Sequence, residues 1–127
     1  MTVPRPGALA MNHPTGLPYT PARAVGDWVV VSGQLGLRDG AFPDEFGDEV
    51  DAVLDNLRLR LAEHGLGMEQ VVKTTCFLTD LGQFAVFNER YGRAFAEPRP
   101  ARSAVQVAAL PLDGRVEIEA WAHRSQS

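Results

Sequence analysis

The sequence predicts an α+β domain in which a mixed β-sheet packs two helices against one of its faces. Three observations indicate this class: β-rich segments recur along the chain, two segments carry apolar residues at helical spacing, and the order is strand, strand, helix, strand, helix, strand, strand. Helices and strands in this order are most simply arranged as one sheet with both helices on one side. A chain of 127 residues, 45% hydrophobic and 22% charged, has the size of a single domain, which we expect to span residues 1–127.

The first part of the chain is rich in residues that break regular structure. Residues 1–18 contain four prolines and two glycines without periodicity, so we expect a loose arm over residues 1–16 and a folded body that begins near Tyr19. The β-rich run "DWVVVSGQ", residues 27–34, predicts a strand that could be buried on both faces. Turn residues follow in "LRDGAFPDE".

The first predicted helix begins at Phe46. Its apolar stripe consists of Phe46, Val50, Val53, Leu54, Leu57 and Leu61. The acidic residues, Glu49 among them, are assigned to a solvated face. Gly65 is expected to end the helix in a left-handed conformation, and His64 in the last turn is better explained by the helix dipole than by a ligand.

A second strong strand and a second helix follow. "MEQVVKTTCFLTD", residues 68–80, predicts the strand, and the aromatic residues Phe84, Phe87, Tyr91 and Phe95 predict a helix that stops before Pro98. The single cysteine, Cys76, excludes an intrachain disulfide and is expected to be a buried core residue. A reactive thiolate needs a nearby cation, and the local candidate, Lys73, is predicted on the opposite face of the strand.

Two closing strands, "RSAVQVA" and "RVEIEAWAHR", flank the turn "PLDG". In the last strand, alternation should turn Val116, Ile118, Ala120 and Ala122 toward the helices. We expect a hairpin that makes the two strands antiparallel neighbours, so that Arg102 and Gln106 share one helix-free surface with Glu117 and Glu119. Either other copies of the chain cover this mixed surface, or it is solvated and carries a salt bridge.

Several function classes are excluded or disfavoured. The net charge is −4 and the basic residues are scattered, which argues against nucleic acid as the main partner. No run of about 18 apolar residues or signal-peptide pattern is present, so a soluble, cytoplasmic protein without a membrane partner is expected. His13, His64 and His123 lie far apart without ligands at suitable spacing, so no metal site is expected. No nucleophile elbow or phosphate loop is found.

Four segments carry a family resemblance: "VVVSGQLGL", "VVKTTCFLTDLGQFAVFNERYGRAF", "RPARSAVQVAALP" and "VEIEAWA". They resemble successive signatures of the reactive intermediate/imine deaminase family, also called YjgF-like or Rid proteins, and the likeness extends from about Leu17 to His123. It implies a chorismate-mutase-like fold and a homotrimer whose sheets form an inner barrel, with clefts between neighbouring subunits.

The resemblance also implies an activity. Family members hydrolyse reactive enamines and imines, such as 2-aminoacrylate, to a 2-keto acid and ammonia. The implied enzyme is a 2-iminobutanoate/2-iminopropanoate deaminase-like hydrolase of C–N bonds that limits metabolite damage and uses neither metal nor bound cofactor.

Two residues match the catalytic positions of the family. Arg102 matches the arginine that binds the substrate carboxylate, and a planar guanidinium can hold a carboxylate through two parallel charge-assisted hydrogen bonds. Glu117 matches the glutamate that holds the attacking water. The neighbouring Glu119 matches no catalytic position and could be a structural or interface carboxylate.

Further residues match substrate-binding positions. Tyr19 matches a cleft tyrosine, although "GLPYTPA" has Pro21 where the family has glutamine. Ser32 and Gly33 are expected to supply polar and backbone contacts, and Asn88 either borders the cleft or lies on the helix surface. Ala104 stands where archetypal members have a cysteine. Imine hydrolysis does not require a thiol, so this difference bears on substrate preference and on thiol-based regulation.

Other readings stay open. In a non-catalytic alternative, the same arginine cleft binds or senses a keto acid or another small carboxylate, and the missing cysteine supports it. The endoribonuclease activity attributed to some relatives would need a basic groove, which the net charge argues against. A deaminase specialised for a catabolic enamine would share the deaminase site.

Overall fold

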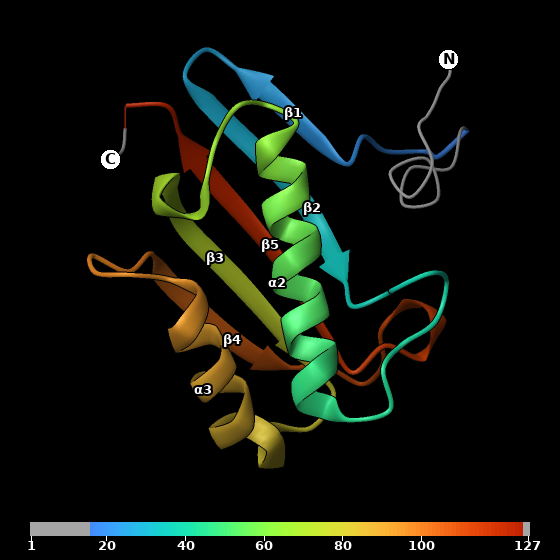
Figure 1. Cartoon of the computed structure of the whole chain (residues 1–127). Helices are drawn as coiled ribbons and strands as arrows, with labels where there is room; N and C mark the ends of the chain where they lie inside the picture. Colours follow the sequence, from blue (N-terminus) through green and yellow to red (C-terminus); the bar gives the residue numbers. More distant parts are fainter. Residues whose placement is uncertain (1–15, 126–127) are drawn as a thin grey trace.

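The computed structural model describes residues 16–125 and shows one mixed five-stranded sheet with two helices on one face (Figure 1). Most of the predicted N-terminal arm, as well as His13, lies outside the described residues. The predicted element order is confirmed. The strands are β1 (Ala22–Val25), β2 (Trp28–Leu35), β3 (Val71–Leu78), β4 (Ala101–Gln106) and β5 (Val116–His123).

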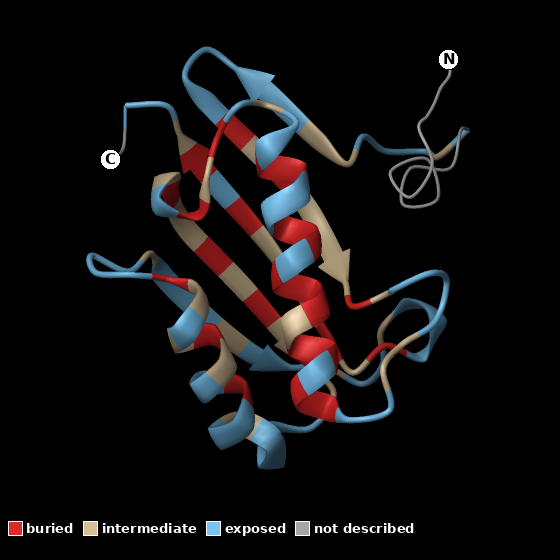
Figure 2. Ribbon diagram, in the orientation of Figure 1, coloured by how far each residue is buried: buried red, intermediate tan, exposed pale blue. Residues whose placement is uncertain are grey.

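The two helices are α2 (Phe46–Ala62) and α3 (Phe84–Ala94), as their apolar spacing predicts. Figure 2 shows that α2 turns a continuous buried stripe toward the sheet. Gly65 has a φ of 75° just after α2, which confirms the predicted left-handed residue at this end. Among residues 16–125, no helix combines the length and apolar character needed to cross a lipid bilayer.

The order of the strands differs from the prediction. The sheet runs β1-β2-β5-β3-β4, so the last strand of the chain lies in the middle. β4 pairs in parallel with β3, and β5 pairs antiparallel with both β2 and β3. The predicted hairpin between β4 and β5 is therefore wrong. The "PLDG" segment forms a 3₁₀ turn, Pro111–Asp113, in a connection that carries the chain across β3.

This strand order also corrects the predicted helix-free surface. Arg102 lies opposite Thr74 of β3, and Thr74 lies opposite Ala120 of β5. Thr74 and Ala120 are buried, so Arg102 is on the helix-covered face. Gln106 shares this face, and its side-chain oxygen accepts from the backbone N–H of Leu81.

Glu117 lies opposite Phe77 in the row that faces away from the helices. Its neighbours Val116 and Ile118 are fully buried beneath the helices, as alternation along β5 predicts. The prediction that Arg102 and Glu117 share one face of the sheet was wrong, because it depended on the hairpin.

The core fills the space between the sheet and the helices. α3 contributes Phe87 and Tyr91, and Phe95 follows directly after the helix; all three are almost fully buried. The Tyr91 hydroxyl makes a 2.7 Å hydrogen bond with the Thr74 hydroxyl, and burial raises the Tyr91 pKa to about 12. Cys76 is buried as predicted, and burial raises its thiol pKa to about 11. A thiol with this pKa is not an activated nucleophile at neutral pH.

An ion pair between a buried glutamate and a partly exposed arginine joins α2 to the start of β5. Glu49, predicted on the solvated face of the helix, is fully buried. Its carboxylate accepts from the backbone N–H of Arg115 at 2.8 Å and from Arg115 Nε at 2.6 Å. Arg115 Nη2 also donates to the carbonyls of Pro43 and Asp44. These bonds fix the N-terminal end of β5, two residues before Glu117, against the loop that precedes α2.

The face of the sheet opposite the helices carries aromatic and charged side chains. Trp28 and Trp121 are 40% and 46% exposed, and their rings meet edge to face at 6.2 Å between centroids. The His123 ring lies 4.8 Å from Trp28. Lys73 donates to the Ser103 hydroxyl at 3.2 Å on the same face. Exposed tryptophans in contact with each other are typical of a surface that binds another protein surface.

The Glu49–Arg115 pair generates a stability prediction. Arg115→Ala leaves the Glu49 carboxylate buried without its cation, which should lower the free energy of unfolding by about 3 kcal/mol. The matched control is Arg93→Ala, because Arg93 pairs with Glu89 on the helix surface at 3.1 Å. A surface pair of this kind contributes about 0.5 kcal/mol or less. Urea unfolding of both variants measures the difference, and equal losses would contradict this account of the buried pair.

Candidate functional site

The residues predicted for the site fall into two separate groups. The first, the arginine cluster, consists of Arg102 and Ala104 on β4 and Asn88 on α3. The second, the glutamate cavity, is a hollow that Glu117 of β5 lines together with Gly33 of β2 and Tyr19 of the segment before β1. Ser32 lies beside this cavity but is not among its lining residues.

In the arginine cluster, the guanidinium of Arg102 lies on an aromatic platform. Its central carbon is 4.9 Å from the ring centroid of Tyr91, 5.3 Å from that of Phe84 and 5.7 Å from that of Phe87. Arg102 Nη1 donates to Asn88 Oδ1 at 2.8 Å. Cation–π contacts and this hydrogen bond hold an otherwise flexible side chain in one place. The aromatic side chains of α3 thus hold the guanidinium of Arg102 in addition to filling the core, the role predicted for them.

Arg102 has no carboxylate partner among residues 16–125. The hydrogen bond to the neutral Asn88 amide occupies one of its five N–H groups, and the residue is exposed. A guanidinium that is fixed in position but not neutralised can receive a carboxylate from outside the chain. Ala104, two residues further along β4, lies on the same face and packs partly buried against the core.

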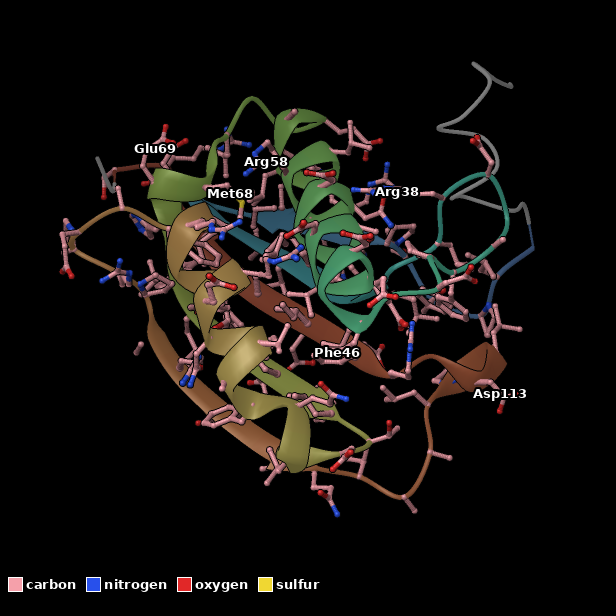
Figure 3. All side chains as sticks on the ribbon, turned by 60° about the horizontal axis from the view of Figure 1, so that its bottom comes forward. Arg38, Phe46, Arg58, Met68, Glu69 and Asp113 are labelled. Carbon is pink, nitrogen blue, oxygen red and sulfur yellow. The ribbon has the colours of Figure 1, made fainter. Side chains whose placement is uncertain are left out.

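The glutamate cavity has a volume of about 290 Å³ and lies where β2 ends and β5 begins. It is lined by Leu17, Tyr19, Pro21, Gly33, Gln34, Leu35, Leu37, Asn56, Pro111, Leu112 and Glu117. The loop that carries Asp113 in Figure 3, next to Leu112, borders it. One carboxyl group and one phenol therefore line this hollow, together with largely apolar side chains.

Gly33 makes room for the carboxylate of Glu117. A Cβ atom at position 33 would overlap Glu117 Oε2, so only a residue without a side chain permits this approach. Burial raises the pKa of Glu117 above its usual value, and the negative charge of Glu119 raises it further. A carboxylate with a raised pKa is a stronger base, which suits proton removal from water.

Two polar side chains hold the cavity walls in place. The Ser32 hydroxyl donates to the Thr20 carbonyl at 2.7 Å, next to Tyr19 in the chain, so its contact is with the backbone. The Asn56 side-chain amide donates to the carbonyls of Leu35 and Leu37. Sequence reasoning missed Asn56, although a polar residue on the buried side of a helix is a detectable signal.

The two groups cannot meet within one chain. Arg102 and Glu117 lie two strands apart in the sheet, and their positions differ by three residues along β5, which corresponds to a Cα separation of roughly 14 Å. Their side chains also point to opposite faces of the sheet. One chain therefore presents an arginine cluster and a glutamate cavity as two half-sites.

Residues 16–125 contain no group of three or more His, Cys, Asp or Glu side chains placed to hold a metal ion. The groups that can act on a ligand here are a guanidinium, a carboxylate and a phenol.

Comparisons with known proteins place this geometry in a family. The sequence model of the family described as "Endoribonuclease L-PSP" matches residues 11–124. The chain is 46% identical over 110 residues to Protein DfrA of Myxococcus xanthus, which covers 83% of the chain and 84% of that protein. It is 37% identical over 119 residues to the 2-iminobutanoate/2-iminopropanoate deaminase of Escherichia coli, covering 89% and 93%.

Solved structures agree with this placement. RidA from an Antarctic Psychrobacter species superposes with a TM-score of 0.82 at 40% identity and covers 86% of this chain and 90% of its own. TdcF of E. coli with bound serine superposes with a TM-score of 0.80 at 38% identity, covering 84% and 88%. The chain belongs to the YjgF/Rid family, the family of endoribonuclease L-PSP and the reactive intermediate deaminases.

Proposed function

We propose that this protein is a cofactor-independent deaminase that hydrolyses reactive 2-enamino and 2-imino acids to 2-keto acids and ammonia. The observation that carries the proposal is Arg102, a guanidinium fixed by Asn88 and three rings and left without a carboxylate partner among residues 16–125. A small anionic substrate would supply that partner. The names of the deaminase relatives support the same chemistry.

The complete site is proposed to form between two copies of the chain. Arg102 and Glu117 point to opposite faces, so the arginine cluster of one copy must meet the glutamate cavity of another. Three copies related by a three-fold axis would repeat this heterologous contact and close it. The exposed pair Trp28 and Trp121 supports the idea that a neighbouring copy covers the helix-free face. This assembly is the proposed homotrimer with inter-subunit clefts.

The proposed reaction uses the two half-sites in sequence. The enamine tautomerises to the imine, and Arg102 holds its carboxylate. Glu117 accepts a proton from water as the water oxygen bonds to the imine carbon, and the C=N electron pair moves to nitrogen, which takes up a proton. The hydroxyl group of the resulting aminoalcohol then gives up its proton, the amino nitrogen gains one, and the C–N bond breaks, so that ammonia leaves and the keto group forms. Tyr19, which lines the same cavity as Glu117, would border the substrate.

A binding or sensing module is the second candidate. Ala104, where archetypal family members have a cysteine, is the observation that favours it. The same half-sites would then bind a keto acid or another small carboxylate without turnover.

The first prediction of the proposed function concerns the two proposed reacting residues. Imino acids generated in solution by an amino-acid oxidase should disappear faster with the protein than in buffer. Glu117→Gln should lower kcat/KM by about 10²-fold or more, because general base assistance has that magnitude. Arg102→Ala should lower kcat/KM by a comparable factor. Arg102→Lys should recover part of the loss, because lysine keeps the positive charge but cannot form the two parallel hydrogen bonds of a guanidinium.

Matched controls separate chemistry from surface charge. Arg58→Ala and Glu69→Gln alter exposed residues that belong to neither half-site, and should leave the rate unchanged. A wild-type rate equal to buffer, with saturable keto acid binding that depends on Arg102, would support the binding module instead. Full activity of Arg102→Ala would show that Arg102 does not bind the substrate.

The second prediction concerns pH. Glu117 must be ionised to act as a base, so kcat/KM should fall as the pH drops through its raised pKa. Glu119→Gln removes the like charge that contributes to this rise, which should lower the Glu117 pKa and move the acidic limb of the profile to lower pH. A limb that stays in place or moves to higher pH would show that Glu117 is not the titrating base, or that Glu119 does not act on it.

A further inference from the structure

The walls of the glutamate cavity are apolar beyond the reacting groups. Two polar side chains of the cavity already donate hydrogen bonds to the backbone. The Asn56 amide donates to the carbonyls of Leu35 and Leu37. The Gln34 amide donates to the carbonyl of Ser32 at 2.9 Å. The remaining walls include Leu17, Leu37, Pro111 and Leu112. A ligand in this cavity would therefore contact these apolar side chains as well as Glu117 and Tyr19.

The size of the cavity exceeds the needs of a minimal substrate. Its volume is about 290 Å³, whereas one water molecule occupies roughly 30 Å³ of liquid. A three-carbon imino acid has a single methyl group beyond the reacting carbon. An apolar side chain of three or four carbons would occupy space and surface that this minimal substrate leaves open.

Leu112 is the unusual residue in these walls. Its side chain is 71% exposed, and its backbone lies in the left-handed region, with φ 59° and ψ 22°. Asp113 follows with φ 64°. A left-handed leucine costs about 1 kcal/mol or more, and such residues cluster at ligand sites. Burial in the core does not offset this cost, because the side chain is exposed.

The loop around Leu112 is held firmly. The backbone N–H of Asp113 donates to the Leu110 carbonyl, and that of Gly114 donates to the Pro111 carbonyl. The next residue, Arg115, is bonded to the buried Glu49. Leu112 is thus an exposed apolar side chain fixed at the cavity by both sides of its loop.

We propose that Leu112, with Leu17 and Leu37, forms an apolar subsite that makes this protein prefer 2-imino acids with aliphatic side chains of three or four carbons over 2-iminopropanoate. The inference rests on the proposed function. Leu112 is the residue that would set the preference, because its apolar side chain lines the cavity, is exposed and is held in place by its loop.

The test compares two substrates and two variants. Imines generated from leucine and from alanine are supplied to the wild type, to Leu112→Ala and to Leu112→Asn. Asparagine tolerates the left-handed conformation, so the second variant keeps the loop while replacing the apolar surface. The control is Leu59→Ala, which alters an exposed leucine of α2 outside the cavity.

The wild type should favour the leucine-derived imine in kcat/KM. Both Leu112 variants should reduce that preference by about 10-fold, mainly through a higher KM for the larger substrate, since removing a few methylene groups from a pocket has this effect. Leu59→Ala should keep the wild-type ratio. A wild type without preference, or Leu112 variants that keep its ratio, would overturn the inference while leaving the deaminase proposal in place.

A binding measurement separates the two proposals. Dissociation constants for pyruvate and 4-methyl-2-oxopentanoate are measured by calorimetry on the same proteins. If no imine is hydrolysed, the deaminase proposal fails, but a preference for the larger keto acid that is lost in both Leu112 variants still supports the subsite. Equal affinities for the two keto acids, or an absence of binding, would overturn the subsite.

Discussion

The central position of β5 is the constraint on which the rest of the structure depends. Because β5 lies between β2 and β3, its alternate side chains divide sharply: Val116, Ile118, Ala120 and Ala122 are fully buried under the helices, and Glu117 and Glu119 face the other way. The Glu49–Arg115 pair fixes the N-terminal end of this strand. Glu117 therefore lies on a strand whose first residues are fixed in position, and Gly33 beside it leaves space for its carboxylate.

The same alternation separates the two groups to which we assign the reaction. β4 is the edge strand next to β3, and its Arg102 belongs to the helix-covered row, where α3 supplies the rings and the amide that hold the guanidinium. In a single chain, the guanidinium of Arg102 and the carboxylate of Glu117 therefore lie too far apart to contact one small molecule. The proposed trimer resolves this separation, because each copy would offer its arginine cluster to one neighbour and its glutamate cavity to the other. Assembly of the trimer would then be required for activity.

Much of the fold could be predicted because periodicity is a local property. The apolar spacing of α2 and α3 and the alternation in β5 appear directly in the sequence, and the structure confirms them. Strand order is not local. The turn chemistry of "PLDG" fits a hairpin equally well, and nothing in it shows that the chain crosses β3, so the face of Arg102 was predicted wrongly. Glu49 was assigned to solvent because its partner, Arg115, lies far away in sequence. The left-handed backbone of Leu112 has no sequence signal, since leucine rarely adopts it.

Complementation between inactive chains tests the central claim, that the site is built from two copies. Arg102→Ala and Glu117→Gln proteins are unfolded, mixed in equal amounts and refolded together, with each variant and the wild type refolded alone as references. Random assembly of a trimer gives about a quarter of the clefts both an intact arginine and an intact glutamate. The account predicts imine hydrolysis at about that fraction of the refolded wild type. A mixture no more active than the two separate variants would contradict it.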